Sequence, residues 1–284
     1  MSVVRVPAST SNLGAGFDFL GLALDLWLEA RLEDGRGEPV YQGTLADLDP
    51  DEDLIASILI ERDLLRARRL VVSSSIPVGR GLGSSAAATV AAFALAGLER
   101  DDIYKEAAAR EGHPDNVGPA VYGGLVLAAH KPTRLLLHRS IGIALAVPDL
   151  IVPTKLARER LPLDVPTGIV IQQAQRAAAL VQGLVSGDAD LVDFGMDDRL
   201  AVPMRKDLIP GYDNAVDAGL DAGAWGVTIS GAGSTLVAVT DAAIVDGVAE
   251  AMAEALRAAG TVAMPMVPGV AGGYTLTRGA RLAT

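Results

Sequence analysis

A glycine-rich turn that runs directly into an alanine-rich stretch constrains the fold more than any other feature. Residues 77–87 read Pro-Val-Gly-Arg-Gly-Leu-Gly-Ser-Ser-Ala-Ala, with glycine at positions 79, 81 and 83. Glycine adopts backbone conformations closed to other residues and lets the main chain approach an anion closely. A following helix offers unpaired N–H groups and its positive dipole end to phosphate. The turn therefore predicts a phosphate-binding loop before a helix, with Ser84 as the helix cap.

A plain connection before a helix is the simpler interpretation of this turn, because glycine-rich turns are common. The loop also lacks the signatures of two nucleotide-binding folds. It has no lysine at the position that P-loop enzymes use, and it is not the Gly-x-Gly-x-x-Gly that opens a βαβ dinucleotide unit. The sequence favours ATP as the ligand, but not a P-loop fold.

Composition excludes several classes of function. The 284-residue chain has 35 acidic and 24 basic residues, and its net charge of -11 repels nucleic acid and anionic membranes. It has no cysteine, which excludes disulfides and thiolate metal sites. No signal-peptide pattern opens the chain, and its longest mostly apolar run, residues 86–98, is shorter than the roughly 20 residues of a membrane span. We expect a cytoplasmic protein with a small-molecule substrate, and neither a nucleic-acid nor a membrane partner.

Helices and strands alternate along the chain, and 50% of the residues are hydrophobic, enough to fill the cores of two domains. Because the glycine loop lies in the middle of the first half, the alternation favours an α+β fold over a doubly wound one. We expect one domain over residues 1–148 and a second over residues 149–284. The boundary is placed at Pro148, after a strand over residues 141–147.

Local patterns predict further elements. A loop is expected over residues 8–18, after a short first strand, and a helix over residues 54–67. A helix over residues 101–110 is expected to open with an aspartate cap at Asp101. Residues 151–153 are expected to form a strand of the second domain.

A polar cluster follows the helix predicted over residues 101–110. Residues 111–116 read Glu-Gly-His-Pro-Asp-Asn. Glu111 can offer oxygen to Mg²⁺, which prefers one or two carboxylates together with water and substrate phosphates. An exposed acid at a helix end is the simpler interpretation of this residue. His113 can contact a substrate or only a backbone carbonyl, so the residue types leave both roles open.

Three further features gain meaning only in combination. Asp18 lies between two phenylalanines, where an unpaired charge is costly, so a partner or a ligand is expected. Arg158 and Arg205 are ordinary surface arginines when taken singly, but their forked donors together suit a carboxylate. The loop Ser-Gly-Ala-Gly-Ser at residues 230–234 is either a tight hairpin or a backbone segment that approaches a ligand.

Three of these segments, in this order, resemble the three motifs of the GHMP kinase superfamily. They are residues 7–18 (Pro-Ala-Ser-Thr-Ser-Asn-Leu-Gly-Ala-Gly-Phe-Asp), the glycine loop and residues 230–234. Within the superfamily the chain is similar to the homoserine kinase family in residues 12–18, 111–117 and 154–158. The resemblance covers nearly the whole chain.

This resemblance implies a two-domain α+β GHMP kinase fold. Its N-terminal domain is ribosomal protein S5 domain 2-like and its C-terminal domain is ferredoxin-like, with ATP and substrate between them. It implies phosphorylation of the side-chain hydroxyl of L-homoserine, a step toward threonine, with ATP and Mg²⁺. A homodimer is a further expectation from the family.

The resemblance also implies a role for each motif residue. The residues implied in ATP binding are Pro77, Val78, Gly79, Arg80, Gly81, Leu82, Gly83, Ser84, Ser85, Gly231 and Gly233. Ser85 and Glu111 are implied as the Mg²⁺ ligands. The residues implied in homoserine binding are Asn12, Asp18, His113 and Asp115, with Arg158 and Arg205 on the carboxylate. Asp18, Ser85 and Glu111 form the implied catalytic set, in which Asp18 orients the attacking hydroxyl.

Two positions depart from the family pattern. Ser234 stands where the family usually has proline, which alters the stiffness of the third loop. Asp53-Leu54 stands where the family usually has Asn-Leu near the adenine, which leaves the purine contacts open.

Two other functions compete with this interpretation. One is a GHMP kinase that acts on another small alcohol, such as mevalonate or shikimate; Arg158, Arg205 and His113 favour an amino acid instead. The other is a nucleotide-binding sensor without turnover. Intact Ser85 and Glu111 favour an enzyme, because a sensor has no chemical need for them.

Overall fold

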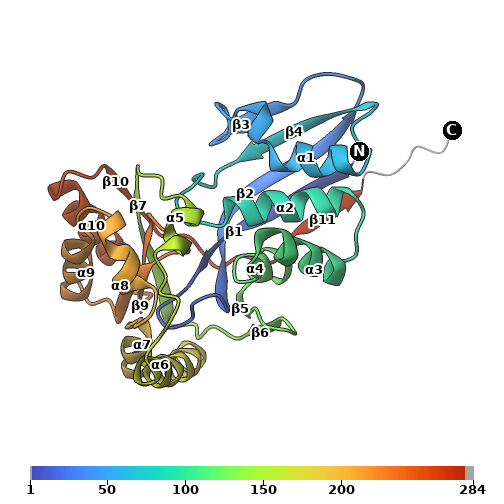
Figure 1. The fold of residues 1–284 in the computed structure, drawn as a ribbon. Coiled ribbons are helices and arrows are strands. Elements are labelled where there is room, and N and C mark those ends of the chain that lie inside the picture. The colour runs from blue at the N-terminus through green and yellow to red at the C-terminus, as the bar shows by residue number, and fades with distance from the viewer. Residues whose placement is uncertain (1, 279–284) are drawn as a thin grey trace.

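The computed structural model describes residues 2–278, which form two β-sheets with helices packed on them (Figure 1). Met1 and residues 279–284, the outer ends of the two predicted domains, lie outside the described residues. The strands are β1 (Ser2–Ser11), β2 (Leu20–Asp34), β3 (Val40–Gly43), β4 (Arg68–Ser74), β5 (Leu125–Leu127), β6 (Thr133–Leu135), β7 (Ile141–Pro148), β8 (Gly226–Ile229), β9 (Leu236–Asp241), β10 (Ala263–Met266) and β11 (Thr275–Arg278).

The α-helices are α1 (Leu54–Glu61), α2 (Ser84–Leu95), α3 (Arg100–Glu111), α4 (Val117–Tyr122), α5 (Thr154–Glu159), α6 (Thr167–Ser186), α7 (Ala189–Met196), α8 (Val202–Arg205), α9 (Tyr212–Asp221) and α10 (Val245–Ala258). Two short 3₁₀ helices are η1 (Pro50–Glu52) and η2 (Lys206–Leu208). Within residues 2–278, no helix combines the length and the apolar character that crossing a membrane requires.

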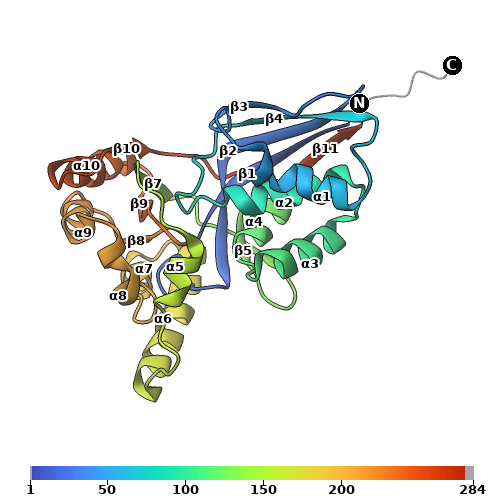
Figure 2. The same ribbon diagram turned by 45° about the horizontal axis from the view of Figure 1, so that its top comes forward.

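The first sheet has the strand order β11-β1-β2-β4-β3, with β5 paired to β2 and β6 paired to β5. All neighbours are antiparallel except β3 and β4. The long strand β2 pairs with β5 through residues 20–22 and with β4 through residues 28–34. Helices α1 to α4 lie on one side of this sheet (Figure 2).

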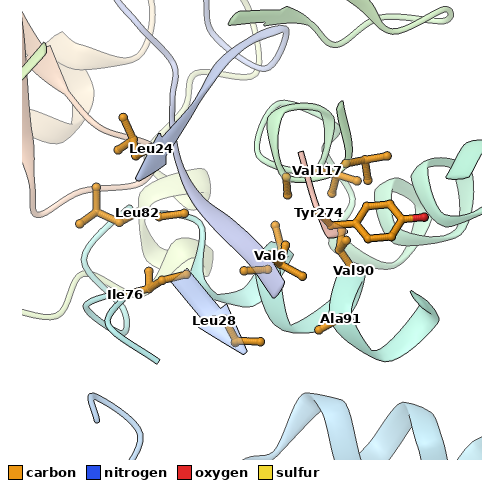
Figure 3. Packing of buried hydrophobic residues seen from close by; sticks show 14 of the residues in the cluster. Val6, Leu24, Leu28, Ile76, Leu82, Val90, Ala91, Val117 and Tyr274 are labelled. Atoms are coloured by element: carbon orange, nitrogen blue, oxygen red, sulfur yellow. The ribbon is translucent and has the colours of Figure 1, made fainter. Parts of the chain in front are cut away.

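Two buried side chains, one just before the glycine loop and one within it, attach the loop to the hydrophobic core beneath the first sheet. Ile76, just before the loop, and Leu82, within it, are 0% and 1% exposed and pack among strand and helix side chains (Figure 3). Six of the twelve residues of α2 are alanine, the strongest helix former, and their small side chains allow close packing on β1. The loop is therefore fixed to the first core through apolar burial.

The second sheet has the order β10-β7-β9-β8, all antiparallel. Every residue of β7 is buried, and its side chains alternate between two cores. Ile143 and Leu145 belong to the first hydrophobic cluster, whereas Ala144 and Ala146 belong to a second cluster with α9 and α10. The continuous apolar run in this strand follows from burial on both faces.

Sheet membership divides the chain differently from the predicted boundary at Pro148. Strand β7, which precedes Pro148 in the chain, belongs to the second sheet, and β11 returns to the first sheet to pair with β1. The sheets therefore do not support a division into residues 1–148 and 149–284. We propose that the first domain comprises residues up to about 140 together with β11. The second domain then comprises the part of the chain from β7 to the segment before β11.

Both predicted side-chain caps were wrong. Helix α2 does begin at Ser84, but its N-cap is Gly83 with a left-handed φ of 68°, and no side chain caps it. Helix α3 begins at Arg100 with Glu99 at the N-cap and no side-chain cap, so Asp101 lies inside its first turn. Helix α2 starts from a glycine loop packed against distant segments, contacts that a local sequence pattern does not reveal. Helix α3 starts at an exposed N-cap, Glu99.

Three predicted segments also differ. Residues 8–11 continue β1 instead of starting a loop, because they pair with residues 21–24 of β2. Helix α1 ends at Glu61, six residues before the predicted end. Residues 151–153 are not a strand but an irregular segment leading into α5.

Helix α1 begins with a buried aspartate cap. Oδ1 of Asp53 accepts hydrogen bonds from the N–H groups of Ile55 and Ala56, at 2.8 and 3.1 Å. Its Oδ2 accepts one from the Tyr41 hydroxyl at 2.7 Å. Burial, and then the hydrogen bond to Asp53, raise the pKa of Tyr41 above its ordinary value. Asp53 thus anchors α1 to the first sheet.

Asp53→Ala should lower the free energy of unfolding by about 1–2 kcal/mol, because it removes the cap of α1 and leaves the Tyr41 hydroxyl without its acceptor. Asp53→Asn should lose less, because asparagine also caps helices well. Urea denaturation measures both. Asp49→Ala, at the exposed cap of η1, is the matched control, and an equal loss there would contradict the role given to Asp53.

Candidate active site

One cavity of about 440 Å³ brings together residues from both halves of the chain. It is lined by Asn12, Leu54, Gly79, Gly81, Gly83, Ser84, Ser85, Ala86, Thr89, Arg110, Glu111, His113, Asp115, Asn116, Val152, Thr154, Arg158, Arg205, Gly231, Ala232 and Gly233. Most residues singled out in the sequence therefore lie around a single space.

The glycine loop needs its glycines. Gly79, Gly81 and Gly83 have φ values of 69°, 75° and 68°, in the left-handed region. A Cβ on Gly81 would lie 2.1 Å from the Ser230 carbonyl oxygen, and one on Gly83 would lie 2.1 Å from the Ser9 hydroxyl oxygen. Any side chain at these two positions would push the loop off the segments it packs against.

Three consecutive carbonyl groups of the loop accept hydrogen bonds from the surrounding protein. The Arg80 carbonyl accepts from the Thr235 N–H at 3.1 Å, and the Leu82 carbonyl accepts from the Ser9 N–H at 3.1 Å. Between them, the Gly81 carbonyl accepts from the Ser230 hydroxyl at 2.7 Å. With these acceptors satisfied, the loop can present its N–H groups to an anion.

The loop over residues 230–234 connects the antiparallel strands β8 and β9, as a hairpin does, and its backbone packs against the glycine loop and β1. Its approach to a ligand stays a prediction. The Gly231 N–H donates to the Ser11 carbonyl at 2.9 Å, and the hydroxyls of Ser230 and Thr10 lie 2.8 Å apart. Ser234, at the usual proline position, donates its hydroxyl to the Leu150 carbonyl, a contact that proline cannot make.

Asn12 lines the cavity, but both ends of its amide are already used. Its Nδ2 donates to the Gly231 carbonyl at 2.9 Å, and its Oδ1 accepts from the Asp18 N–H at 2.8 Å. Asn12 and Asp18 both have a φ of 60°, which is uncommon outside glycine but better tolerated by Asn and Asp. Asn12 therefore joins the first motif to the third, and its predicted contact with substrate stays a prediction.

Ser85 and Glu111 meet as predicted, and a third residue joins them. The Ser85 hydroxyl donates to Oε1 of Glu111 at 2.9 Å, and the Thr89 hydroxyl donates to the same atom at 2.8 Å. Sequence reasoning missed Thr89. The signal was present, because residues four apart on a helix share a face and Thr89 follows Ser85 by four.

His113 pairs with buried Asp115, their Nδ1 and Oδ1 atoms 2.9 Å apart. This hydrogen bond raises the pKa of His113 above its ordinary value, against the opposing effect of burial. Burial also acts to raise the pKa of Asp115, but the hydrogen bonds from His113 and from the Asn116 N–H outweigh it, so this pKa lies below its ordinary value. The pair brings a protonatable imidazole to the cavity.

The Asn116 amide links this pair to β1. Its Nδ2 donates to the Ser11 hydroxyl at 2.8 Å, and its Oδ1 accepts from the Ser9 hydroxyl at 2.9 Å. These serines were predicted in a loop, but they are buried in β1 and hold the residue that follows Asp115.

The two arginines are held differently. Arg158 donates from both Nη atoms to the Asp18 carboxylate, at 3.3 and 2.8 Å. Arg205 is only 4% exposed, donates its Nε to the Ala157 carbonyl at 2.9 Å, and places its guanidinium carbon 4.9 Å from the Phe17 ring centroid. Burial, and then the charge of Arg158, lower the pKa of Arg205. Among residues 2–278, no carboxylate forms an ion pair with Arg205.

Several predicted residues do not line the cavity, namely Asp18, Pro77, Val78, Arg80 and Leu82. Asp18 reaches the site through Arg158. Arg80 turns to the Val78 carbonyl at 2.6 Å and to the Asp149 carboxylate at 2.5 Å, which ties the loop to the segment after β7. Of the Asp53-Leu54 pair, Leu54 lines the cavity. The Asp53 carboxylate instead accepts hydrogen bonds from the first turn of α1 and from Tyr41.

The geometry agrees with comparisons to known proteins. The model of the GHMP kinases N terminal domain matches residues 54–124, and that of the GHMP kinases C terminal matches residues 180–258. A homoserine kinase from Thermus thermophilus is 40% identical over 255 residues, covering 84% of this chain and 86% of the relative. The chain belongs to the GHMP kinase family, among the homoserine kinases. A homoserine kinase from Gloeobacter violaceus is 40% identical over 276 residues, covering 88% of this chain and 91% of the relative.

Solved structures give the same fold. The crystal structure of a homoserine kinase from Cytophaga hutchinsonii has a TM-score of 0.83 at 31% identity and covers 97% of each chain. A mevalonate kinase from L. major has a TM-score of 0.69 at 14% identity, a likeness of fold alone. These matches confirm the predicted two-domain α+β GHMP kinase fold, and membership of a kinase family implies that this chain is an enzyme that uses ATP on a small molecule.

A pH titration of the three histidines by NMR should find His113 titrating above the ordinary value of 6.5, because Asp115 stabilises its charged form. Asp115→Asn should lower that pKa, and His113→Gln assigns the signal.

The raised pKa of His113 adds folding stability that is present below pH 6.5 and lost as pH rises through the folded-state pKa. The lowered pKa of Asp115 adds stability above 3.8 that is lost as pH falls through its folded value. An unchanged His113 pKa in Asp115→Asn would contradict the pairing.

Proposed function

We propose that this protein is a homoserine kinase, which transfers the γ-phosphoryl group of ATP to the side-chain hydroxyl of L-homoserine and forms O-phospho-L-homoserine. The observation that carries the proposal is the convergence of all three motifs, the Ser85–Glu111 pair and two arginines on one cavity. Relatives named homoserine kinase at 40% identity over most of the chain support the choice of substrate.

The glycine loop binds the triphosphate in this proposal. Phosphoryl transfer through a loose transition state needs positioning and charge neutralisation more than covalent help. The N–H groups of residues 79–85 and the N-terminus of α2 supply donors without a lysine. Gly231 and Gly233 close the same space from the third loop.

The donor set at Ser85 and Glu111 fits Mg²⁺. A carboxylate oxygen and a hydroxyl oxygen lie 2.9 Å apart on the cavity wall, and oxygen ligands are what this hard cation takes. No group of three or more His, Cys, Asp or Glu side chains within the described chain could hold a metal by itself, so phosphate and water complete the set proposed here. When bound, Mg²⁺ neutralises phosphate charge.

The arginines receive the substrate carboxylate in this proposal. Arg205 keeps its Nη groups free of a carboxylate partner within residues 2–278, so it is the principal anchor. The fork of Arg158 is shared with Asp18, which holds that carboxylate beside the cavity, where it can orient the attacking hydroxyl. His113 and Asp115 line the remaining wall of the proposed pocket.

A coupled ADP-release assay with homoserine, mevalonate, shikimate and galactose tests the substrate. Homoserine should give ADP well above the rate with ATP alone, because two arginines suit the carboxylate of an amino acid. Release with another alcohol but not with homoserine would make the substrate assignment wrong. Release with none of the four would favour a nucleotide-binding sensor.

Arg205→Ala should raise the KM for homoserine by about tenfold or more, since a lost hydrogen bond to a charged group costs about 1.5–3 kcal/mol. The KM for ATP should change little. Arg176→Ala is a matched control, because Arg176 is also buried and stacked, 4.5 Å from the Phe194 centroid, but lies outside the cavity. Equal increases in both KM values would refute the carboxylate assignment.

The cytoplasmic location, the homodimer and the absence of nucleic-acid and membrane partners stay predictions. Size-exclusion chromatography with light scattering would measure the oligomeric state.

A further inference from the structure

Thr89 occupies a position that the proposed chemistry has not used. It follows Ser85 by one helical turn on α2, is fully buried, and lines the cavity. Its hydroxyl donates across to Glu111, the last residue of α3, at 2.8 Å. Threonine inside a helix commonly bonds the carbonyl four residues earlier on its own helix. Here the hydroxyl serves a neighbouring helix instead.

The two hydroxyls on Oε1 of Glu111 differ in freedom. Ser85 is exposed and lies in the first turn of α2, so its hydroxyl can turn from donating to Glu111 to offering a lone pair elsewhere. Thr89 is 0% exposed, and its branched side chain has restricted χ1 rotamers. When Ser85 turns away, Thr89 is the side-chain donor that remains on this oxygen among the described residues.

We propose that Thr89 is a positioning residue that holds the Glu111 carboxylate in a fixed orientation while Ser85 and Glu111 bind the divalent cation of the ATP complex. The proposal rests on the proposed function for the identity of that cation. Thr89 acts through Glu111 and does not itself touch metal or phosphate. Oε2 of Glu111 accepts no hydrogen bond from residues 2–278, and the fixed Oε1 keeps this second oxygen turned the same way in every turnover.

The decisive variants are Thr89→Val, which keeps the shape and removes the donor, and Thr89→Ser, which keeps the donor and removes a methyl group. Thr240→Val is the matched control. Thr240 is also 0% exposed, and its hydroxyl donates at 3.2 Å to the Gly223 carbonyl in the second domain. Thermal unfolding checks that each variant is folded.

The direct readout is Mn²⁺ binding to the protein with a non-hydrolysable ATP analogue, followed by electron paramagnetic resonance. Residues that orient a metal ligand typically change metal affinity by about 10–100-fold, so Thr89→Val should weaken Mn²⁺ binding by about tenfold or more. Thr89→Ser and Thr240→Val should stay within about threefold of the parent protein. The Mg²⁺ concentration for half-maximal ADP release should rise in parallel in Thr89→Val, with little change in the KM for homoserine.

Unchanged Mn²⁺ affinity in Thr89→Val would overturn the proposal, and so would an equal loss in Thr89→Ser, since that would assign the effect to packing. Failure of the parent protein to bind Mn²⁺ with the nucleotide would overturn it as well. Failure of homoserine to stimulate ADP release would contradict the proposed function alone, because the Mn²⁺ measurement needs no acceptor.

Discussion

The hydrogen bonds on three consecutive carbonyl groups of the glycine loop are the constraint on which the site depends. The donors are Ser9 of β1 and Ser230 and Thr235 of the β8–β9 connection, so parts of the chain more than 200 residues apart set the shape of one short turn. A flexible turn would have to be ordered by its ligand at an entropic cost. In this protein the loop is ordered by folding itself. Ser9 and Ser230 pack so closely against Gly83 and Gly81 that a side chain at either glycine would not fit.

The acidic side chains around the cavity are held in place by hydrogen bonds as well. Asp18, Glu111 and Asp115 each have a fixed partner: an arginine fork, two hydroxyls and an imidazole. An unpaired carboxylate beside a triphosphate would repel it. Paired and oriented, these groups can stand next to an anion in a chain whose net charge is already -11.

The sequence predicted the motif residues well and their connections poorly. The spacing of the glycines predicted the loop, and family resemblance predicted the pairing of Ser85 with Glu111. Both predictions depend only on which residue types stand at fixed positions. The cap at Ser84 failed because the glycine loop, packed against Ser9 and Ser230, sets the start of α2, and the cap at Asp101 failed because α3 begins one residue earlier, at Arg100. The amide of Asn12 donates to the Gly231 carbonyl, a partner 219 positions away that no local pattern shows, and its contact with substrate stays a prediction. The sheet membership of β7 could not be predicted for a similar reason, since an apolar run does not tell which sheet a strand joins.

In the domain division proposed above, the return of β11 to the first sheet makes the second domain an insertion, attached to the first by two covalent connections instead of one. The later connection is further pinned by bridges from Leu24 to Val270 and from Gly123 to Gly272. A domain attached by a single linker can rotate in any direction. A domain attached by two connections can rotate mainly about the axis that passes through both attachment points. The second connection therefore limits how the proposed second domain could turn relative to the first, and with it how the cavity between them could open.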